Sequence, residues 1–224
     1  MHGYDFERPT LPIQGTAGAA GSGELYSFDH AVTRAADAQT QARLRLEAAS
    51  AEAQRHVGAS GVPTLRAGRL VAINDATGGG FGGNYVVTAV RHVLVRDANG
   101  GCFSYANEFT SIPSATPFRS ARVTPIPNVG GVLSAVVTGP PGETRFVDRW
   151  GRIKVKFLWD RQGAADDHSS AWIRVANPPG RLGDVFLPNI GDEVLVAFLQ
   201  GDPSRPVVIG TLFNAAHPPP VPLP

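Results

Sequence analysis

The segment from residue 148 to residue 214 constrains the fold more than any other part of the chain. Its apolar runs are short, and turn-forming residues separate them at regular intervals. The turns are marked by Gly163, Pro178-Pro179-Gly180, Pro188-Asn189, Gly191-Asp192 and Gly201-Asp202-Pro203. Short apolar runs bounded by Gly, Pro, Asn and Asp are typical of antiparallel strands. The segment therefore predicts an antiparallel β-sandwich or a small β-barrel.

One predicted strand in this segment, residues 193–199, is apolar on both of its faces. Because side chains alternate along a strand, Val194 and Val196 point to one face, and Leu195 and Leu199 point to the other. An antiparallel sheet usually keeps one face in water, so its strands alternate apolar with polar residues. Leaving Leu195 and Leu199 in water would forfeit about 1.5–3 kcal/mol each. We therefore expect another domain, or another copy of the chain, to cover the second face.

The same segment contains a dense set of residues that occur together in one known family. They are Asp148, Trp150, Gly151, Arg152, Ile153, Lys154, Val155, Lys156, Phe157, Trp159, Asp160, Arg161, Ser170, Trp172, Ile173, Arg174, Val175, Pro188, Ile190, Gly191, Glu193, Val194, Leu195, Val196, Phe198, Gly201, Asp202, Pro203, Arg205, Pro206, Gly210 and Asn214. A sparser set continues upstream: Tyr4, Asp5, Phe6, Pro9, Leu65, Arg66, Ala67, Gly68, Tyr85, Val86, Val87, Val90, His92, Tyr105, Asn107, Phe109, Pro113, Pro117, Phe118 and Arg119. On these residues the chain resembles the VgrG spike proteins of type VI secretion systems and the related phage baseplate hub and spike proteins.

The resemblance spans nearly the whole chain and implies its domain organisation. The implied fold is mainly β: a hub-type β-barrel portion with one long helix, followed by a five-stranded barrel of the oligonucleotide/oligosaccharide-binding (OB) type. We expect residues 1–118 to be the C-terminal part of the hub domain and residues 119–214 to be the OB barrel at the base of the spike. Residues 215–224 form a Pro-rich tail, which in the family leads to a β-helix needle. The resemblance implies that the hub start and the needle are both missing here.

Local patterns predict the elements of the first part of the chain. A helix is expected from residue 29 to residue 57, because this stretch lacks Pro and Gly and is rich in Ala, Gln, Arg, Leu and Glu. Strands are expected at 69–74, 85–96 and 102–110, and a hairpin turn at 97–101 joins the last two, since Asn-Gly accommodates positive φ.

Composition limits the classes of function. The formal net charge of +1 gives no general attraction to nucleic acid or to anionic membranes. Cys102 is the only cysteine, so the chain has no internal disulfide, which fits folding in a reducing cytosol. The sequence has neither an apolar run of transmembrane length nor a secretory signal. We expect no stable membrane insertion, and a protein that is cytoplasmic during assembly and is then secreted or injected, or is part of a phage-tail-like particle.

Two motifs suggest chemistry, but their contexts do not support it. The run Gly78-Gly79-Gly80-Phe81-Gly82-Gly83 matches GxGxxG, the fingerprint of a dinucleotide-binding turn, which needs a helix directly after it. A β-favouring run follows instead, so we expect a hairpin loop and no cofactor. The other motif, Asp166-Asp167-His168 with Ser169 and Ser170, suggests metal ligands or half of a catalytic set. Adjacent residues rarely converge on one ion, so we expect a solvated loop and no metal.

Other catalytic signatures are absent from the sequence. The remaining histidines, which are His2, His30, His56, His92 and His217, form neither HExxH nor a zinc spacing, and there is no GxSxG. We therefore expect no catalytic, cofactor-binding or metal-binding residues and no enzyme activity. A wall-degrading tail enzyme component stays an alternative, because some phage spikes carry a lysozyme domain beside the barrel.

The OB-type fold raises another alternative, a binding module for nucleic acid or glycan. The aromatic residues Trp150, Phe157, Trp159 and Trp172 could stack on bases, and the basic residues Arg149, Arg152, Lys154 and Lys156 could contact phosphates. Acidic residues in the same segment balance these basic ones, so the electrostatic signature of a nucleic-acid site is missing. We expect no nucleic-acid partner.

The resemblance instead implies a structural function in a contractile injection machine. In the family, three copies form a hub that adapts the inner tube to the spike, and the spike punctures the target envelope. The implied partners are two further copies of the chain, the inner tube protein, a spike-tip protein and effectors.

Overall fold

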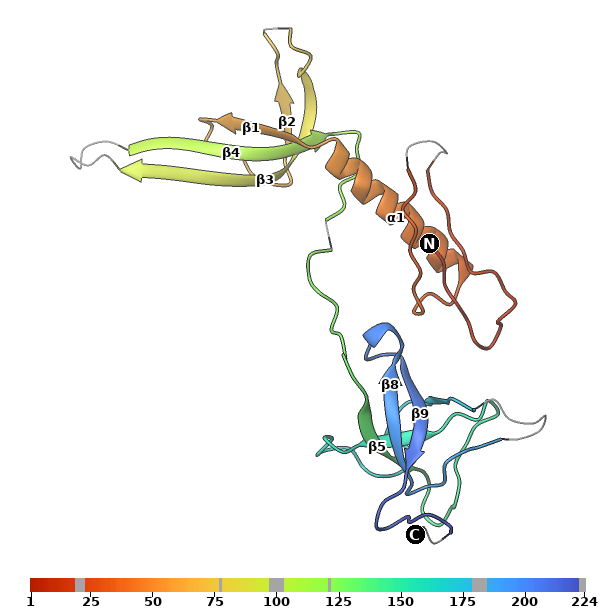
Figure 1. Ribbon diagram of the computed structural model, residues 1–224. Coiled ribbons are helices and arrows are strands. Elements are labelled where there is room, and N and C mark those ends of the chain that lie inside the picture. The colour runs from red at the N-terminus through yellow and green to blue at the C-terminus, as the bar shows by residue number, and fades with distance from the viewer. Residues whose placement is uncertain (19–22, 77, 97–102, 121, 179–184, 222–224) are drawn as a thin grey trace. The chain divides into compact units, whose positions relative to one another are not determined.

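The computed structural model describes residues 1–18, 23–76, 78–96, 103–120, 122–178 and 185–221. The chain divides into two compact units, Met1–Val123 and Thr124–Pro224 (Figure 1). The fold is mainly β, with one α-helix in the described part of the chain, which confirms the predicted fold class.

The α-helix is shorter than the sequence predicts. Helix α1 spans Ala35–Ala53, whereas the composition predicts a helix over residues 29–57. On the N-terminal side, Asp29 holds a turn instead, because its carboxylate accepts a hydrogen bond from the Ala31 amide (2.8 Å). On the C-terminal side, the chain leaves the helix and enters strand β1 (His56–Ser60). Pairing with a neighbouring strand outweighs the weak local preference for further helical residues.

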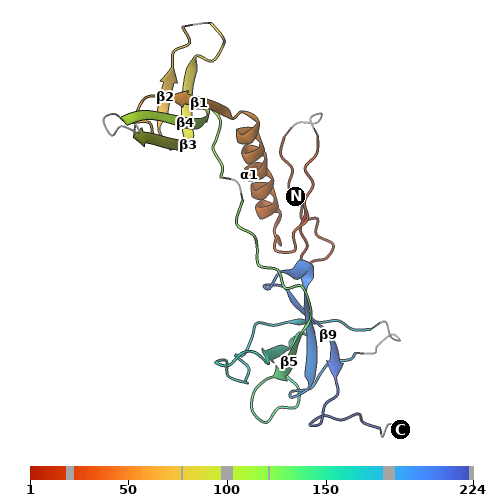
Figure 2. The same cartoon turned by 60° about the vertical axis from the view of Figure 1, so that its left-hand side comes forward.

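The first unit contains an antiparallel sheet with the strand order β1-β4-β3-β2. Its other strands are β2 (Leu70–Ile73), β3 (Gly83–Arg96) and β4 (Phe103–Pro113), as Figures 1 and 2 show. These three confirm the predicted strands, and the hairpin turn predicted at 97–101 lies outside the described residues. The sequence does not predict β1, because Gly58 suggests the end of a helix. Gly58 instead lies opposite Phe109 of β4, and a Cβ at Gly58 would lie 2.7 Å from the ring of Phe109.

The second unit contains a five-stranded sheet with the order β6-β5-β8-β9-β7. Its strands are β5 (Leu133–Thr138), β6 (Lys154–Phe157), β7 (Arg174–Val175), β8 (Glu193–Phe198) and β9 (Pro206–Leu212). The short strand β7 pairs in parallel with β9, and the other pairs are antiparallel. Five strands agree with the expected OB-type barrel.

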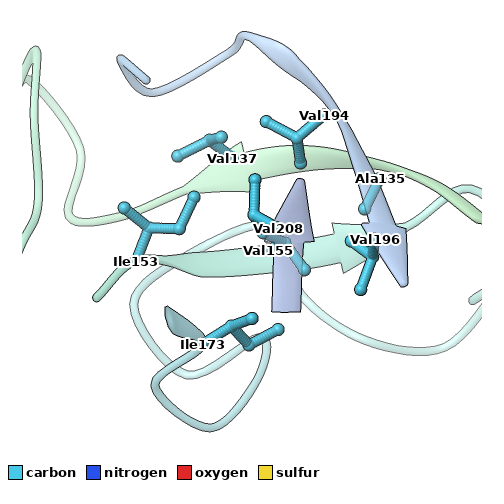
Figure 3. Packing of buried hydrophobic residues seen from close by; sticks show 8 residues of the cluster. All are labelled: Ala135, Val137, Ile153, Val155, Ile173, Val194, Val196 and Val208. Atoms are coloured by element: carbon cyan, nitrogen blue, oxygen red, sulfur yellow. The ribbon is translucent and has the colours of Figure 1, made fainter. Parts of the chain in front are cut away.

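The core of the second unit is made of aliphatic side chains of β5, β6, β8 and β9, together with the residues directly before β6 and β7 (Figure 3). Its members are Ala135, Val137, Ile153, Val155, Ile173, Val194, Val196 and Val208. Ile153 and Ile173 form an isolated antiparallel bridge that brings the start of β6 and the start of β7 together. Because Val194 and Val196 are fully buried here, the predicted inner face of residues 193–199 is confirmed.

The segment between the two sheets is held at each of its ends by its own unit. In the first unit, the guanidinium of Arg119 forms an ion pair with Glu47 of α1 (2.6 Å). In the second unit, the amide of Val129 donates to the carbonyl of Gly201 (2.8 Å). The unit boundary lies at 123/124, a few residues after the predicted division at 118/119.

We expect Ile153→Ala to lower the free energy of unfolding of the second unit by about 2–5 kcal/mol, because it leaves a cavity in a fully packed core. All three tryptophans lie in the second unit, so urea unfolding followed by tryptophan fluorescence reports on this unit. The matched control is Ile126→Ala, since the Ile126 side chain is 75% exposed, and its cost should stay within about 0.5 kcal/mol. Equal effects of the two substitutions would contradict the assignment of the core.

Candidate assembly surfaces

The outer face of β8 and β9 is only partly covered by the chain itself. Leu195 is neither buried nor fully exposed, and Ile209 is 47% exposed. Leu199, which the sequence predicts on the same strand, instead begins the 3-10 turn Leu199–Gly201 directly after β8, and it is also only partly buried. Leu195 lies opposite Gly210 of β9, and a Cβ placed on Gly210 would meet no atom within 4 Å. There is therefore open space above this pair of residues. The predicted apolar second face therefore exists.

A tight turn before β6 is organised by the carboxylate of Asp148. One oxygen, Oδ1, accepts hydrogen bonds from the amides of Trp150 and Arg152 (both 2.9 Å), and Oδ2 accepts from the Arg152 guanidinium (2.6 Å). The guanidinium of Arg149 lies over the Trp150 ring, 5.2 Å from its centroid. The turn thus places Trp150 at the surface, where it is 45% exposed, and the hydrogen bonds to Asp148 fix the backbone of the turn.

These contacts shift the acidity of Asp148. Partial burial acts to raise the pKa of its carboxyl, but hydrogen bonds from the amide and guanidinium of Arg152 and from the Trp150 amide outweigh burial. The net pKa lies below the ordinary value of an aspartate. Because the folded state favours the charged carboxylate, Asp148 stabilises the unit above the unfolded pKa, and this contribution is lost as the pH falls through the folded pKa.

A second turn follows β6 and presents another aromatic residue. Asp160 accepts hydrogen bonds from the amides of Gly163 (2.9 Å) and Gln162 (3.0 Å), and these bonds lower the pKa of its carboxyl. Trp159 is 66% exposed, and its ring stacks on Phe157 with a centroid distance of 5.4 Å. The ring of Phe157 also stacks on Phe198 at 6.3 Å. The turn therefore exposes the Trp159 ring, and stacking on Phe157 fixes the position of this ring.

The aromatic residues considered for nucleic-acid binding do not all share one environment. Trp172 is half-buried, with Phe146 at 4.9 Å on one side and the Lys154 ammonium at 5.2 Å. Arg152 is engaged by Asp148. Of the four aromatic residues in the predicted set, Trp150 and Trp159 are therefore the exposed ones. The guanidinium of Arg152 stabilises the turn at Asp148.

The two motifs with apparent chemistry lie in loops. A strand, β3, begins at the end of the Gly78–Gly83 run, so no helix N-terminus is available there for a pyrophosphate. Asp166, Asp167 and His168 bring one ligand atom each within 4.8 Å of one another, and the His168 imidazole lies 3.0 Å from the Asp167 carboxylate. Exposed acidic groups commonly lie this close without a cation, so we assign no ligand to the cluster.

A groove of about 550 Å³ lies beside β9 in the second unit. Its lining combines apolar residues, including Val175, Pro178, Phe186, Leu187 and Ile209, with the polar residues Asn177, Asp192 and Thr211. Among the described residues, this lining contains no histidine, cysteine or serine.

The first unit exposes an apolar surface that the sequence does not predict. We call residues 91–96 of β3 and 103–106 of β4 the distal ribbon. Within it, Leu94 is 63% exposed, Val95 is 54% exposed and Phe103 is 64% exposed. The run Val93-Leu94-Val95 is apolar on both strand faces, which is the same signal that marks residues 193–199.

The order of the two units matches known families. Residues 1–98 match the phage tail baseplate hub family (GPD), and residues 143–213 match the type VI secretion system/phage-baseplate injector OB domain. Over 99% of its length, the chain is 36% identical to the type VI secretion system spike protein VgrG5 of Pseudomonas aeruginosa. The chain belongs to the VgrG spike protein family.

Two other similarities extend this comparison. Over 81% of its length, the chain is 35% identical to the actin cross-linking toxin VgrG1 of Vibrio cholerae, of which it spans 17%. It is also similar in structure to the E. coli c3393 protein, a component of the type VI secretion system with structural similarity to the T4 bacteriophage tail proteins gp27 and gp5. That match has a TM-score of 0.55 and 28% identity, and it covers 76% of this chain and 42% of c3393. The chain spans 31% of the length of the curated relative VgrG5.

The VgrG assignment confirms the family and the OB-type barrel that the sequence predicts. In the described part of the chain, no helix combines the length and the apolar character needed to cross a membrane.

We expect Asp148→Asn to lower the free energy of unfolding of the second unit by about 1.5–3 kcal/mol at pH 7, because it removes charge-assisted hydrogen bonds. The deficit should shrink as the pH falls below the ordinary pKa of an aspartate, about 3.9, and should vanish once the pH has fallen through the lower pKa of Asp148 in the folded state. Urea unfolding followed by tryptophan fluorescence at several pH values measures both effects. Glu143→Gln removes an exposed carboxylate of the same unit and is the control. A deficit that does not depend on pH would contradict the assigned role of the charge.

Proposed function

We propose that this chain is a structural part of the hub and spike base of a contractile injection machine. In this proposal three copies form a hub that carries the spike, and the spike punctures the target envelope and carries effectors. Support comes from membership of the VgrG family and from the order of the units, hub first and OB barrel second. Since fold alone does not define function, the proposal also needs a surface suited to assembly.

The outer face of β8 and β9 is the observation that carries the proposal. Leu195, Leu199 and Ile209 remain partly or largely exposed. The valines on the inner face of the same two strands are fully buried. A second copy that covered the exposed side chains would remove this apolar area from water. Identical chains usually assemble with closed cyclic symmetry, so a ring of three copies can cover one such face in each copy.

The segments of the chain take separate roles in the proposal. Residues 1–118 contribute to the hub, residues 119–214 form the base of the spike, and residues 215–224 lead away from the barrel. The partners are two further copies, the inner tube protein, a spike-tip protein and effectors. The protein assembles in the cytoplasm and is then secreted or injected.

We propose no enzymatic role for this chain. The match to the spike protein VgrG5 covers 99% of the chain, and the hub and OB families account for both units. Incubation with peptidoglycan should therefore release no fragments. Single-stranded DNA should show no salt-sensitive gel shift, since the basic residues of the OB unit are balanced by acidic ones.

We expect the wild-type chain to show a native mass near three times 23.6 kDa across a dilution series. Leu195→Asp should dissociate the trimer, because it places a charge on the face to be covered. Its tryptophan fluorescence should stay that of the wild type, since Leu195 lies outside the core.

The control for this experiment is Leu70→Asp, which alters a leucine that is 71% exposed in the other unit and should leave the trimer intact. A soluble, stable trimer from both Leu195→Asp and Leu199→Asp would show that this face is not the contact. A wild-type chain that stays monomeric at every concentration would overturn the proposed trimer.

A further inference from the structure

We propose that residues 214–217, which we call the exit loop, attach the C-terminal tail to the OB barrel and fix the direction in which residues 218–221 leave it. Asn214 and His217 are the positioning residues of this attachment. The inference deepens the proposed function, in which the tail leads away from the barrel, and it rests on that function only for what the tail carries. The attachment lies within one copy of the chain.

Asn214 closes the exit loop with both its side chain and its backbone, shortly after β9 ends at Leu212. Its side-chain oxygen Oδ1 accepts hydrogen bonds from the amides of Ala216 (3.0 Å) and His217 (2.9 Å). Its own amide donates to the carbonyl of His217 (3.1 Å). An asparagine side chain that accepts from amides directly downstream stabilises a compact turn. The exit loop therefore has a defined shape.

Two side chains of the exit loop also contact the barrel. The side-chain amide of Asn214 donates to the carboxylate of Glu193, the first residue of β8 (3.1 Å). Nδ1 of His217 lies 3.2 Å from Oδ1 of Asp192, which directly precedes that strand. The His217 ring also lies against Gly191, since a Cβ at Gly191 would lie 3.0 Å from its Nε2. A side chain larger than that of glycine at this position would push the exit loop away from the barrel.

The barrel residues that the exit loop contacts are themselves held by the core. The amide of Gly191 donates to the carbonyl of Val137, and the amide of Val137 donates to the carbonyl of Asp192 (both 2.9 Å). Val137 belongs to β5 and is a buried member of the core. The second oxygen of Asp192, Oδ2, accepts from the amide of Asn189 (2.8 Å). The exit loop is therefore attached to a well-fixed part of the unit.

The residues after the exit loop extend the direction that it sets. Pro218, Pro219 and Pro220 follow directly, and residues 214–224 contain no glycine, serine or threonine. The proline ring fixes φ, and a run of prolines favours polyproline II geometry with a rise of about 3.1 Å per residue. The three prolines therefore carry the direction over about 9 Å. A linker rich in Gly and Ser would instead behave as a random coil.

A flexible hinge in the same place would have a different consequence. A hinge would let the tail swing, so a push on the barrel would bend the junction before it moved the tail. The exit loop instead couples the tail to the start of β8 and to the turn before it. The two cases differ in the spread of distances between the tail and the barrel, and this spread is measurable.

The test measures the distances between a spin label on the tail and a spin label on the barrel. Val221→Cys and Ser204→Cys place the labels at exposed positions of the second unit, and Cys102→Ser removes the only other cysteine. Labelled chain is mixed with an excess of unlabelled chain, so that each distance belongs to one copy. Asn214→Ala should widen the distance distribution about twofold or more, because the tail then moves as a flexible linker.

The matched control is His168→Ala, which should leave the width of the distribution unchanged. The His168 imidazole also lies close to an aspartate of the same unit, 3.0 Å from Asp167, but it lies outside the exit loop. His217→Ala should widen the distribution less than Asn214→Ala does, because a contact between exposed charged groups contributes little by itself. Urea unfolding followed by tryptophan fluorescence should show that all these variants are folded.

Amide hydrogen exchange gives a second measurement on the same proteins. The amides of Ala216 and His217 should exchange about tenfold faster or more in Asn214→Ala, while β9 should be equally protected in both proteins. A wild-type distance distribution as broad as that of Asn214→Ala would overturn the attachment, whatever the native mass of the chain. A narrow distribution in a chain that stays monomeric would support the attachment and overturn only the proposed trimer.

Discussion

The second unit depends on one small core in which every side chain is aliphatic. Ile153 and Val155 hold β6 to this core, and Ile173 holds the start of β7. Val194 and Val196 belong to the middle strand β8, and Val208 belongs to its neighbour β9. None of these side chains carries a polar atom, so the core itself contributes hydrophobic packing alone. The turns that present Trp150 and Trp159 leave from β6 or lead into it, so their positions depend on the same core.

Two strands of this chain are apolar on both faces, and their surroundings differ. In β8, the inner face is buried by the core and the outer face is partly covered. In the distal ribbon, neither face and neither edge has a strand against it in the described part of the chain. The described part of the chain therefore leaves two chemically distinct apolar surfaces uncovered: a sheet face and the edges of a ribbon.

Local sequence predicts those elements whose signals are local. β-branched runs bounded by Gly and Asn mark β2 and β3, and the two-faced pattern marks β8. The ends of α1 are not predictable in this way. Asp29 forms a turn with Ala31, and His56 pairs with Ser111 of β4, which is distant in sequence. The distal ribbon escapes prediction for a similar reason. Its apolar residues are visible in the sequence, but its exposure depends on where β1 and β2 stop pairing, which is a matter of register.

The anchoring of the interdomain segment has a mechanical consequence. The segment runs directly into β5, so tension on it could peel β5 away from β6 and β8 one pair at a time. Val129 is bonded to Gly201 before β5 begins, and the Asn128 side chain lies close against the same glycine. A force that pulls on the segment therefore acts first on this contact with Gly201, in the turn directly after β8. The strands of the barrel are loaded only after this contact breaks.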